Sequence, residues 1–475
     1  MDDKRQKIQY ELAFPGNQEG EALRTSGEGT EPSVAGRGTE RLASTERLME
    51  EVCERENLRK ALQRVRANKG SAGIDGMTVG ELPAYLTEHW PALRDQVLSG
   101  TYRPAPVKRV CIPKPDGGKR NLGIPTVLDR FLQQAVLQVL QTRWDPTFSE
   151  YSYGFRPNRS PHQAVDQAQR YIAMGHGWVV DIDLEKFFDR VNHDRLMGRV
   201  AQRVTDRRML RLIRAFLNAG VMEDGLVSPT EEGTPQGGPL SPLLSNLVLD
   251  ELDRELELRG HRFVRYADDC NIYVRSERAG QRVMKSVSTF ITRRLKLKVN
   301  DSKSAVARPS ERKFLGFRLT GGKEPKKRIS VQALERFKKR VRERTRRKGG
   351  ASLERTVKDL APYLRGWAEY FAGPDSYWLL RELDSWVRRR LRCVVWKQWR
   401  TGRTRYTGLR RRGVRAHLAA ATAASPFGPW RLSRSRAMSL AVSNAELRIA
   451  RPSSHERPNQ TLTEPPCTRP VRTVV

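Results

Sequence analysis

The sequence has few cysteines and no long hydrophobic run. Its five cysteines lie far apart in a chain of 475 residues and form no C-x-x-C pair. This spacing indicates neither a zinc site nor a disulfide framework, so we expect reduced thiols. No run of about 18 apolar residues occurs, and the N-terminus lacks the apolar segment of a signal peptide. These absences predict a soluble cytoplasmic protein without a membrane partner.

Acidic residues are scarce relative to basic ones. The chain has 88 Lys and Arg against 54 Asp and Glu, a formal net charge of +34. Such an excess indicates a polyanionic partner, most commonly nucleic acid, although a basic protein without such a partner is the alternative. Residues 326–415 alone hold 28 Lys and Arg against 8 Asp and Glu. This Trp-containing segment, with a net charge of +20, is therefore the main candidate for nucleic-acid binding.

Composition divides the chain into five parts. Residues 1–44 are rich in Gly, Glu, Ser and Thr and predict a disordered extension, and residues 451–475 predict a disordered tail. Residues 45–100 open with a predicted amphipathic helix that runs from Thr45 and stops at Gly70. In residues 101–322, strand-like runs alternate with helical segments, which predicts a mixed α/β (α+β) domain. Residues 323–450 are basic and predict a helical domain.

Acidic residues end two of the strand-like runs. The stretch "RYADDCNIYV", residues 265–274, places Asp268 and Asp269 between two such runs and predicts a tight hairpin. An Asp pair in a turn is usually ordinary turn chemistry. In "GWVVDIDLEKFFDRVNH", however, Asp181 and Asp183 lie on one strand face, because they are two residues apart. A strand end beside the hairpin would gather three carboxylates, which suit Mg²⁺ ions that clamp the oxygens of a displacement at phosphorus.

Two further segments have features that nucleotidyl transfer needs. "IPKPDGGKRNLGIP" predicts a hairpin with Lys114, Lys119 and Arg120 around its turn, where fixed cations could hold a triphosphate. The alternative is an ordinary exposed hairpin. "TPQGGPLSP" places Gln236 before two glycines, which allow the backbone to approach a ligand closely, although a simple loop is the alternative.

Together these segments resemble the reverse transcriptase family, and more narrowly the reverse transcriptase/maturase proteins of bacterial group II introns. The resemblance covers residues 50–450 and depends on the order of the motifs "GSAGIDGMTV", "IPKPDGGKRNLGIPTVLDR", "YGFRPNRS", "VDIDLEKFFDRVNH", "EEGTPQGGPLSPLLSNLVLDELD", "RYADDCNIYV", "LKLKVNDSKS" and "FLGF". It implies right-hand polymerase fingers and palm, with an antiparallel palm sheet, in residues 101–322. A helical thumb/maturase domain is implied in residues 323–450. Since no paired cysteines of an HNH endonuclease occur, the chain resembles the endonuclease-less class.

The resemblance also implies roles for the acidic residues. The family's first metal-binding Asp is followed five residues later by an aromatic residue and then by another Asp. This frame selects Asp183 rather than Asp181. Asp268 matches the second metal ligand and Asp269 the third acid, and the cofactors implied are two Mg²⁺ ions.

Other motif residues match contacts to the deoxynucleoside triphosphate (dNTP) and to the primer. The dNTP contacts are Lys114, Arg120, Phe188, Gln236 and Lys303. Phe188 matches the steric gate against a ribose 2′-OH, with a core phenylalanine as the alternative, and Phe187 is expected to be a core residue. Lys303 matches a lysine near the leaving pyrophosphate, with a surface lysine as the alternative. The residues that match the primer grip are Phe314, Leu315 and Gly316. The loop that contains Gly70, Gly73 and Gly76 resembles one that closes over the template.

The partners implied are nucleic acids: an RNA template with a DNA or RNA primer, group II intron RNA in a ribonucleoprotein, and target DNA. A run on one predicted helix could follow an RNA backbone, namely Arg388, Arg389, Arg390 and Arg392, although most charge runs are merely solvated. The function implied is an RNA-directed DNA polymerase that also acts as a maturase in splicing and retrohoming. Two alternatives stay open: an RNA-binding splicing cofactor with a vestigial polymerase, and a freestanding reverse transcriptase used in DNA repair or phage defence.

Overall fold

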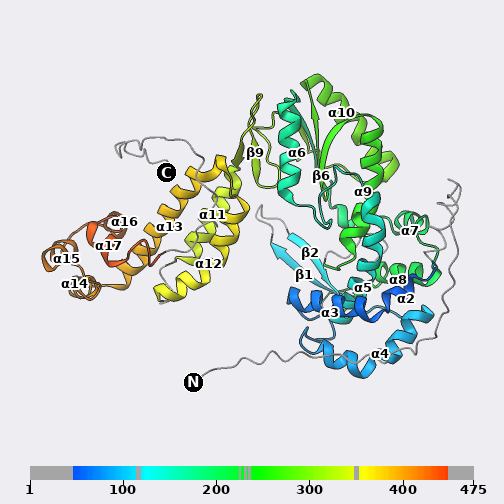
Figure 1. Ribbon diagram of the computed structural model, residues 1–475, viewed down its shortest axis with the longest axis horizontal. Helices are drawn as coiled ribbons and strands as arrows, with labels where there is room; N and C mark the ends of the chain where they lie inside the picture. The colour runs from blue at the N-terminus through cyan, green and yellow to red at the C-terminus, as the bar shows by residue number, and fades with distance from the viewer. Residues whose placement is uncertain are drawn as a thin grey trace, which may run out of the picture. The chain divides into compact units, whose positions relative to one another are not determined.

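The computed structural model describes residues 46–113, 119–223, 226–228, 233, 237–346 and 352–447 (Figure 1). The predicted disordered segments, residues 1–44 and 451–475, lie outside the described residues. The chain divides into two compact units, Met1–Arg308 and Pro309–Val475. The boundary predicted from composition, after residue 322, therefore falls inside the second unit.

The first unit combines α-helices with two sheets. Its helices are α2 (Leu48–Val52), α3 (Arg55–Asn68), α4 (Leu82–Ser99), α5 (Val127–Trp144), α6 (Pro161–Ala173), α7 (His193–Ala201), α8 (Arg207–Leu217), α9 (Ser241–Leu258) and α10 (Glu277–Phe290). Side chains cap several of them: the Thr126 hydroxyl accepts a hydrogen bond from the Asp129 N–H (3.1 Å) at the start of α5. These caps satisfy backbone groups that a helix end leaves without intrahelical partners.

The single N-terminal helix predicted from Thr45 to Gly70 is instead two helices, α2 and α3. The break lies at Cys53 and Glu54, and Glu54 has an extended backbone with φ −61° and ψ 138°. The Asn57 side chain donates a hydrogen bond to the Val52 carbonyl (3.0 Å), which satisfies an end group of α2. The amphipathic pattern continues across the break, so periodicity alone does not reveal it.

The predicted palm sheet has four antiparallel strands in the order β6-β7-β3-β8. Their bounds are β3 (Trp178–Ile182), β6 (Arg262–Tyr266), β7 (Asp269–Val274) and β8 (Ala305–Ala307). Figure 1 shows α6, α9 and α10 beside these strands, against which they pack. The antiparallel palm sheet predicted from the resemblance is thus confirmed.

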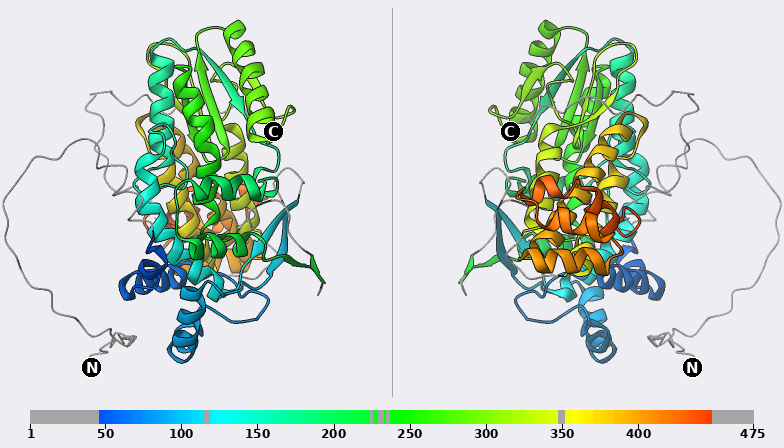
Figure 2. Two further views of the ribbon diagram at one scale, coloured as in Figure 1. Left: turned by 90° about the vertical axis from the view of Figure 1, so that its right-hand side faces the viewer. Right: turned by 90° about the vertical axis from the view of Figure 1, so that its left-hand side faces the viewer.

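A second sheet has the strand order β2-β1-β4-β5. Its strands are β1 (Val107–Pro113), β2 (Lys119–Ile124), β4 (Val221–Glu223) and β5 (Leu226–Ser228). β1 and β2 pair antiparallel, as the "IPKPDGGKRNLGIP" segment predicted, while β1 and β4 pair parallel. Figures 1 and 2 both show the β1–β2 ribbon apart from the palm sheet. The turn that contains Lys114 lies outside the described residues.

The core of the first unit follows from helical periodicity. On α8, Met209, Leu212, Ile213 and Phe216 recur at helical spacing and are all at most 4% exposed. Residues of this kind from the helices join the inward faces of the palm strands in one continuous hydrophobic cluster. This cluster is the support on which the strand ends of the palm sheet are held.

Within its described residues the second unit is helical apart from one hairpin, as its composition predicted. The hairpin strands are β9 (Phe317–Leu319) and β10 (Lys327–Ile329). The helices are α11 (Val331–Arg344), α12 (Leu353–Tyr370), α13 (Tyr377–Gln398), α14 (Gly402–Arg411), α15 (Ala416–Ala423), α16 (Pro429–Leu432) and α17 (Arg436–Ala441). Its core includes Phe337, Leu391 and Trp396, and Trp396 is only 1% exposed. This tryptophan therefore packs the helices together rather than facing a ligand.

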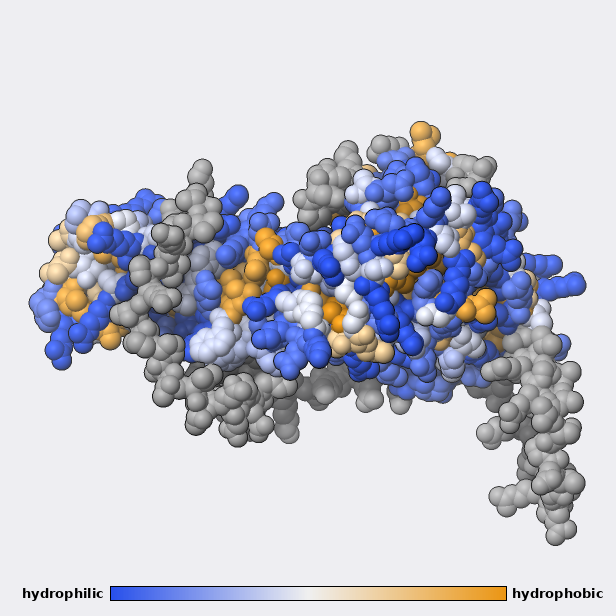
Figure 3. Space-filling view, turned by 90° about the horizontal axis from the view of Figure 1, so that it is seen from above, coloured by the Kyte–Doolittle hydropathy of each residue, from blue (hydrophilic) through white to orange (hydrophobic). Residues whose placement is uncertain are grey.

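No helix in the described ranges is long and apolar enough to cross a membrane. On the face shown in Figure 3, hydrophilic side chains predominate and hydrophobic ones form small patches. This distribution agrees with the charged composition of the chain.

Candidate active site

Strand register brings the predicted acidic residues to one edge of the palm sheet. β3 and β7 pair antiparallel with Ile182 opposite Cys270, so Asp183 and Asp269 come next at the same end of the two strands. β6 and β7 form a hairpin in which Tyr266 pairs with Asp269, leaving a turn of Ala267 and Asp268. A strand end and a hairpin turn thus carry the predicted carboxylates to one place.

A cavity of about 1150 Å³ lies at this edge of the sheet. Asp183 and Asp268 both line it, together with Phe188 and Lys303. Asp269 does not line it and is exposed. Four of the residues predicted to act together, from three separate segments of the chain, therefore meet at one cavity.

The segment "NDSKS", residues 300–304, fastens the end of β3. The Asp183 N–H donates to the Ser304 hydroxyl (3.0 Å), and the Asn300 N–H donates to the Asp183 carbonyl (2.8 Å). The Lys303 N–H closes the turn by donating to the Asn300 carbonyl (3.1 Å). The same turn therefore positions Asp183 and brings Lys303 to the cavity.

A further acid in the cavity wall, Glu185, was not predicted. Its carboxylate forms ion pairs with Lys298 (2.9 Å) and Arg190 (3.0 Å). The hydrogen bond from Lys298 lowers the pKa of Glu185. Because two cations already neutralise this carboxylate, it supports the loop after β3 and is not available as a strong metal ligand.

The carboxylates that line the cavity fit Mg²⁺. Among the described residues, no group of three or more His, Cys, Asp or Glu side chains is arranged to hold a metal ion. Mg²⁺ usually needs only one or two protein carboxylates, because substrate phosphates and water complete its coordination. Asp183 and Asp268 supply such a pair at the cavity.

The two adjacent phenylalanines after β3 have different environments. Phe187 is 2% exposed and belongs to the core, as expected, whereas Phe188 is half-buried and lines the cavity. Their rings meet edge to face at a centroid distance of 5.3 Å. Phe188 thus faces the same cavity as Asp183 and Asp268, and its contact with a nucleotide stays a prediction.

The glycine-rich loop before α9 also reaches the cavity, which Gly237 and Gly238 line. Gly233 has φ +94°, and a Cβ there would lie 2.9 Å from the Phe188 carbonyl oxygen. The Gly233 N–H donates to the Val191 carbonyl (2.8 Å). Gly233 therefore allows this loop to pack directly on the segment that carries Phe188.

For three of the predicted dNTP contacts the side chain lies outside the part of the structure that is described. Lys114 and Gln236 lie outside the described residues. Arg120 lies on β2, where its backbone pairs with Ile112 of β1. Their roles stay predictions.

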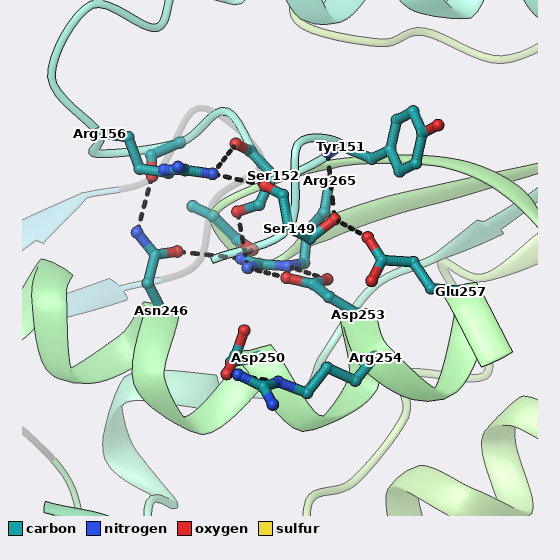
Figure 4. Close-up of polar contacts among 12 residues, drawn as sticks. Ser149, Tyr151, Ser152, Arg156, Asn246, Asp250, Asp253, Arg254, Glu257 and Arg265 are labelled. Carbon is teal, nitrogen blue, oxygen red and sulfur yellow. Dashed lines mark hydrogen bonds and ion pairs between the residues drawn. The ribbon is translucent and has the colours of Figure 1, made fainter. Parts of the chain in front are cut away.

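A buried arginine holds the hairpin turn that carries Asp268 (Figure 4). Arg265 is 1% exposed and forms a bidentate ion pair with Asp253 of α9, at 2.7 Å and 2.5 Å. Its remaining donors reach the Ala267 carbonyl (2.9 Å), the Asn246 side-chain oxygen (3.1 Å) and the Ser152 hydroxyl (2.7 Å). Burial raises the pKa of the Asp253 carboxyl, and the guanidinium opposes that rise.

This arginine network was not predicted. Its partners lie 12 to 113 residues from Arg265 along the chain, apart from Ala267. The only local signal is a charged residue inside the otherwise apolar strand "FVRY". Ala267 itself has φ +58°, so its left-handed backbone needs such support.

The predicted primer-grip residues lie in the second unit. Phe314 is buried and bridges to Phe317. Leu315 has φ +51°, and its carbonyl accepts a hydrogen bond from the Tyr370 hydroxyl (2.8 Å). A Cβ on Gly316 would lie 3.1 Å from the Phe371 ring. The "FLGF" segment is thus a tight turn packed on α12, and its role at a primer stays a prediction.

Two of the predicted RNA-binding arginines, both on α13, have partners inside the second unit. Arg388 forms an ion pair with Asp384 one turn earlier. Arg390 donates to the Thr345 hydroxyl (2.9 Å) at the end of α11. The first pair lies within α13 and the second contact joins α13 to the end of α11, so each engages part of a guanidinium inside the second unit.

The other two arginines of this run are engaged in the same way. Arg389 stacks on the Trp430 ring at 3.6 Å and donates to the Trp430 carbonyl (2.8 Å). Arg392 is 9% exposed and donates to the Val442 carbonyl (3.0 Å) and the Asn444 side chain (2.8 Å). Arg392 thus offers little surface to RNA, and RNA binding by the other three stays a prediction.

An antiparallel palm sheet with aspartates at one edge, beside a cavity lined by a lysine and a glycine-rich loop, defines a template-directed polymerase fold. The family model described as reverse transcriptase (RNA-dependent DNA polymerase) matches residues 112–319. The model described as the group II intron maturase-specific domain matches residues 334–413. The chain belongs to the family of proteins that join a reverse transcriptase domain to a group II intron maturase domain.

Individual relatives agree with this assignment. Protein YkfC of Escherichia coli is 39% identical over 220 residues, which is 45% of this chain and 58% of YkfC. The group II intron-encoded protein LtrA of Lactococcus lactis is 39% identical over 195 residues, which is 41% of this chain and 32% of LtrA. A putative COX1/OXI3 intron 2 protein of Saccharomyces cerevisiae is 30% identical over 237 residues, 49% of this chain and 26% of that protein. The chain thus matches between a quarter and three fifths of the length of these relatives.

Proposed function

We propose that the protein is the RNA-directed DNA polymerase of a group II intron and adds deoxynucleotides to a primer 3′-OH on an RNA template. One observation carries the proposal: Asp183 and Asp268 line a single cavity together with Phe188 and Lys303. All of these residues fall inside the segment matched by the reverse transcriptase model. Carboxylates for Mg²⁺, a cation for the triphosphate and a bulky ring that favours deoxyribose suit the transfer of a deoxynucleotide to a primer 3′-OH.

The proposed chemistry is displacement of pyrophosphate. Two bound Mg²⁺ ions would neutralise the triphosphate and stabilise charge at the attacking and leaving oxygens. Asp183 and Asp268 would hold these ions, with Asp269 as the third acid. In this family most of the rate enhancement would come from positioning and charge stabilisation, as in other phosphoryl transfers.

The remaining predicted contacts would orient the dNTP. Lys114 and Arg120 would hold the triphosphate, and Lys303 would balance charge on the leaving pyrophosphate. Gln236 would lie beside the sugar, and the Phe188 ring would exclude a ribose 2′-OH.

The second unit would add the maturase function. The match to the maturase-specific domain and the net charge of +20 in residues 326–415 support binding of the parent intron RNA, which would assist splicing. Arg388, Arg389 and Arg390 are the proposed contacts to the RNA backbone. The primer grip at Phe314, Leu315 and Gly316, and target DNA as a partner in retrohoming, complete the proposal. Action on target DNA would bring the protein to the nucleoid of a bacterial cytoplasm.

Primer extension on poly(rA)/oligo(dT) with dTTP and Mg²⁺ tests the polymerase. The wild type should extend the primer, and Asp268→Asn should abolish extension. Asp194→Asn is the matched control, because Asp194 is an exposed acid of the same unit that pairs with Arg214 and lies away from the cavity. Extension by Asp268→Asn at the wild-type rate would contradict the assignment of the site.

A separate assay tests the maturase. The Asp268→Asn variant should bind the intron RNA and promote its splicing as well as the wild type does, because RNA binding does not require the metal site. Loss of splicing in a folded Asp268→Asn protein would show that the two activities share the palm cavity.

A further inference from the structure

One large hydrophobic side chain lines the cavity and yet is substantially exposed. Phe155, in the "YGFRPNRS" segment, is 45% exposed and lines the cavity together with Asp183 and Asp268. Phe155 is thus an exposed aromatic ring beside the carboxylates that we propose hold Mg²⁺. Its surroundings suggest a ligand with an apolar face.

The backbone of Phe155 is held in an unfavourable conformation. Its φ is +60°, in the left-handed region, which a bulky aromatic residue rarely adopts. Such a conformation persists only where the surrounding structure enforces it, and these positions gather at functional sites.

The residue before Phe155 is fixed to the hairpin of β6 and β7. A Cβ on Gly154 would lie 2.2 Å from the Ala267 nitrogen, so the two backbones are in direct contact. The Gly154 carbonyl accepts a hydrogen bond from the Asn246 side chain (2.9 Å). Asn246 also accepts from Arg265, which holds the Ala267 carbonyl (Figure 4).

The residue after Phe155 is fixed as well. Arg156 is 9% exposed and donates to the Ser152 carbonyl (3.0 Å), the Asp145 carbonyl (2.8 Å) and the Asp145 carboxylate (2.8 Å). Buried hydrogen bonds on both sides therefore hold Phe155 at the cavity. The same scaffold positions Phe155 and the turn that carries Asp268.

We propose that the Phe155 ring is a stacking surface for a nucleobase at the active site, and that it positions the base pair being formed. Stacking on an aromatic ring tolerates every base, because each base has a π-face, and this suits a polymerase that must copy any sequence. The base belongs either to the template strand or to the incoming dNTP, and both offer the same flat apolar face. This inference depends on the proposed polymerase function.

Variants of Phe155 test the proposal in primer extension on poly(rA)/oligo(dT) with dTTP. Phe155→Leu should lower kcat/KM by roughly 5- to 100-fold, the effect of losing one stacked base. Phe155→Tyr keeps the ring and should stay within a few-fold of the wild type. Phe155→Gly should lower activity like Leu without lowering the melting temperature, because glycine accepts φ +60°. Met174→Ala is the control, since Met174 is 57% exposed in the same unit and lies away from the cavity.

Two binding measurements identify the source of the base and need no turnover. Both use a labelled template with a dideoxy-terminated primer: anisotropy without dTTP gives the affinity for template–primer, and titration with dTTP gives its affinity in the ternary complex. A weaker template–primer complex in Phe155→Leu indicates a template base, and weaker dTTP binding alone indicates the incoming base.

Unchanged binding in both measurements, or equal losses in Phe155→Leu and Phe155→Tyr, would overturn the inference. Absence of extension by the wild type would count against the proposed polymerase function instead, while the binding measurements would still test Phe155.

Discussion

Replacement of Arg265 by methionine should strongly destabilise the hairpin of β6 and β7. Arg265 and Asp253 are 1% and 0% exposed, and their bidentate pair is buried under the turn that carries Asp268. Removing the arginine leaves a carboxylate without its countercharge in the protein interior. Breaking a buried pair in this way costs about 3–5 kcal/mol, because the remaining carboxyl must either keep a desolvated charge or take up a proton.

The matched variant is Arg265→Met/Asp253→Leu, which removes both charges. It avoids the isolated carboxylate but still leaves the Ala267 carbonyl and the Asn246 oxygen without a donor. Each unsatisfied buried acceptor costs about 1–3 kcal/mol when nothing replaces the donor. The double variant should therefore be more stable than the single one and less stable than the wild type.

Hydrogen exchange read by mass spectrometry over residues 262–274 measures this loss locally. Where local opening governs exchange, 3–5 kcal/mol corresponds to a rate increase of roughly 100- to 4000-fold. Primer extension should also require more Mg²⁺, because the turn with Asp268 is less well ordered. Exchange and Mg²⁺ dependence like those of the wild type in Arg265→Met would refute the view that this network positions the hairpin.

The loss in Arg265→Met should depend on pH. Burial raises the pKa of Asp253, and without the guanidinium nothing as strong opposes the rise. The folded variant then keeps the carboxyl protonated while the unfolded chain ionises above about pH 4. The variant should therefore become less stable relative to the wild type as the pH rises from 5 to 8, and recover as it falls.

Three further substitutions test other contacts. Gly154→Ala should destabilise the first unit by about 1–3 kcal/mol or more, because its Cβ would meet the Ala267 backbone at 2.2 Å, and thermal melting measures the loss. Phe188→Ala should increase the use of rUTP relative to dTTP in primer extension if Phe188 is the steric gate; an unchanged ratio would count against that role. Arg392→Met should lower the stability of the second unit by about 1–3 kcal/mol, since it leaves the Val442 carbonyl without its donor. A loss of RNA affinity without a loss of stability would instead indicate that Arg392 contacts RNA.

The meeting of Asp183 and Asp268 at one cavity was predictable from sequence. Apolar runs such as "VVDI" and "NIYV" are typical of strands that are buried within a sheet, and acids at their ends mark where the strands stop. Antiparallel pairing then brings the end of one strand to the hairpin turn of the next. Strand geometry was enough to bring an acid of this strand to the hairpin, whereas the choice of Asp183 over Asp181 came from the family resemblance.

The support beneath the site was not predictable in the same way. Arg265 depends on Asp253 on a helix and on Ser152 more than 100 residues away, so its burial is a property of the tertiary structure. Phe155 likewise reveals its backbone conformation only in the folded chain. Neither residue has a periodic or compositional signal that separates it from a surface arginine or a core phenylalanine.

Helix geometry alone could have predicted that the arginine run on α13 does not lie on one face. Successive residues of an α-helix point about 100° apart, so Arg388, Arg389 and Arg390 cannot lie on one face. The structure accordingly gives each a different partner: Asp384, Trp430 and Thr345. Charge density predicted a nucleic-acid partner. Helix geometry argues that the three arginines do not form one continuous RNA-binding stripe along α13.

The role of Arg265 is one of geometry rather than of charge. The Asp253 carboxylate already neutralises the guanidinium, so the pair adds little net field at Asp183 and Asp268. What the arginine contributes is a planar set of donors that reaches Asp253, Ser152, Asn246 and Ala267 together. A lysine keeps the charge but has one nitrogen with three donors, which cannot make these contacts at once. Arg265→Lys should therefore fail to restore the Mg²⁺ dependence of the wild type, whereas recovery by lysine would mean that positive charge is what the hairpin requires.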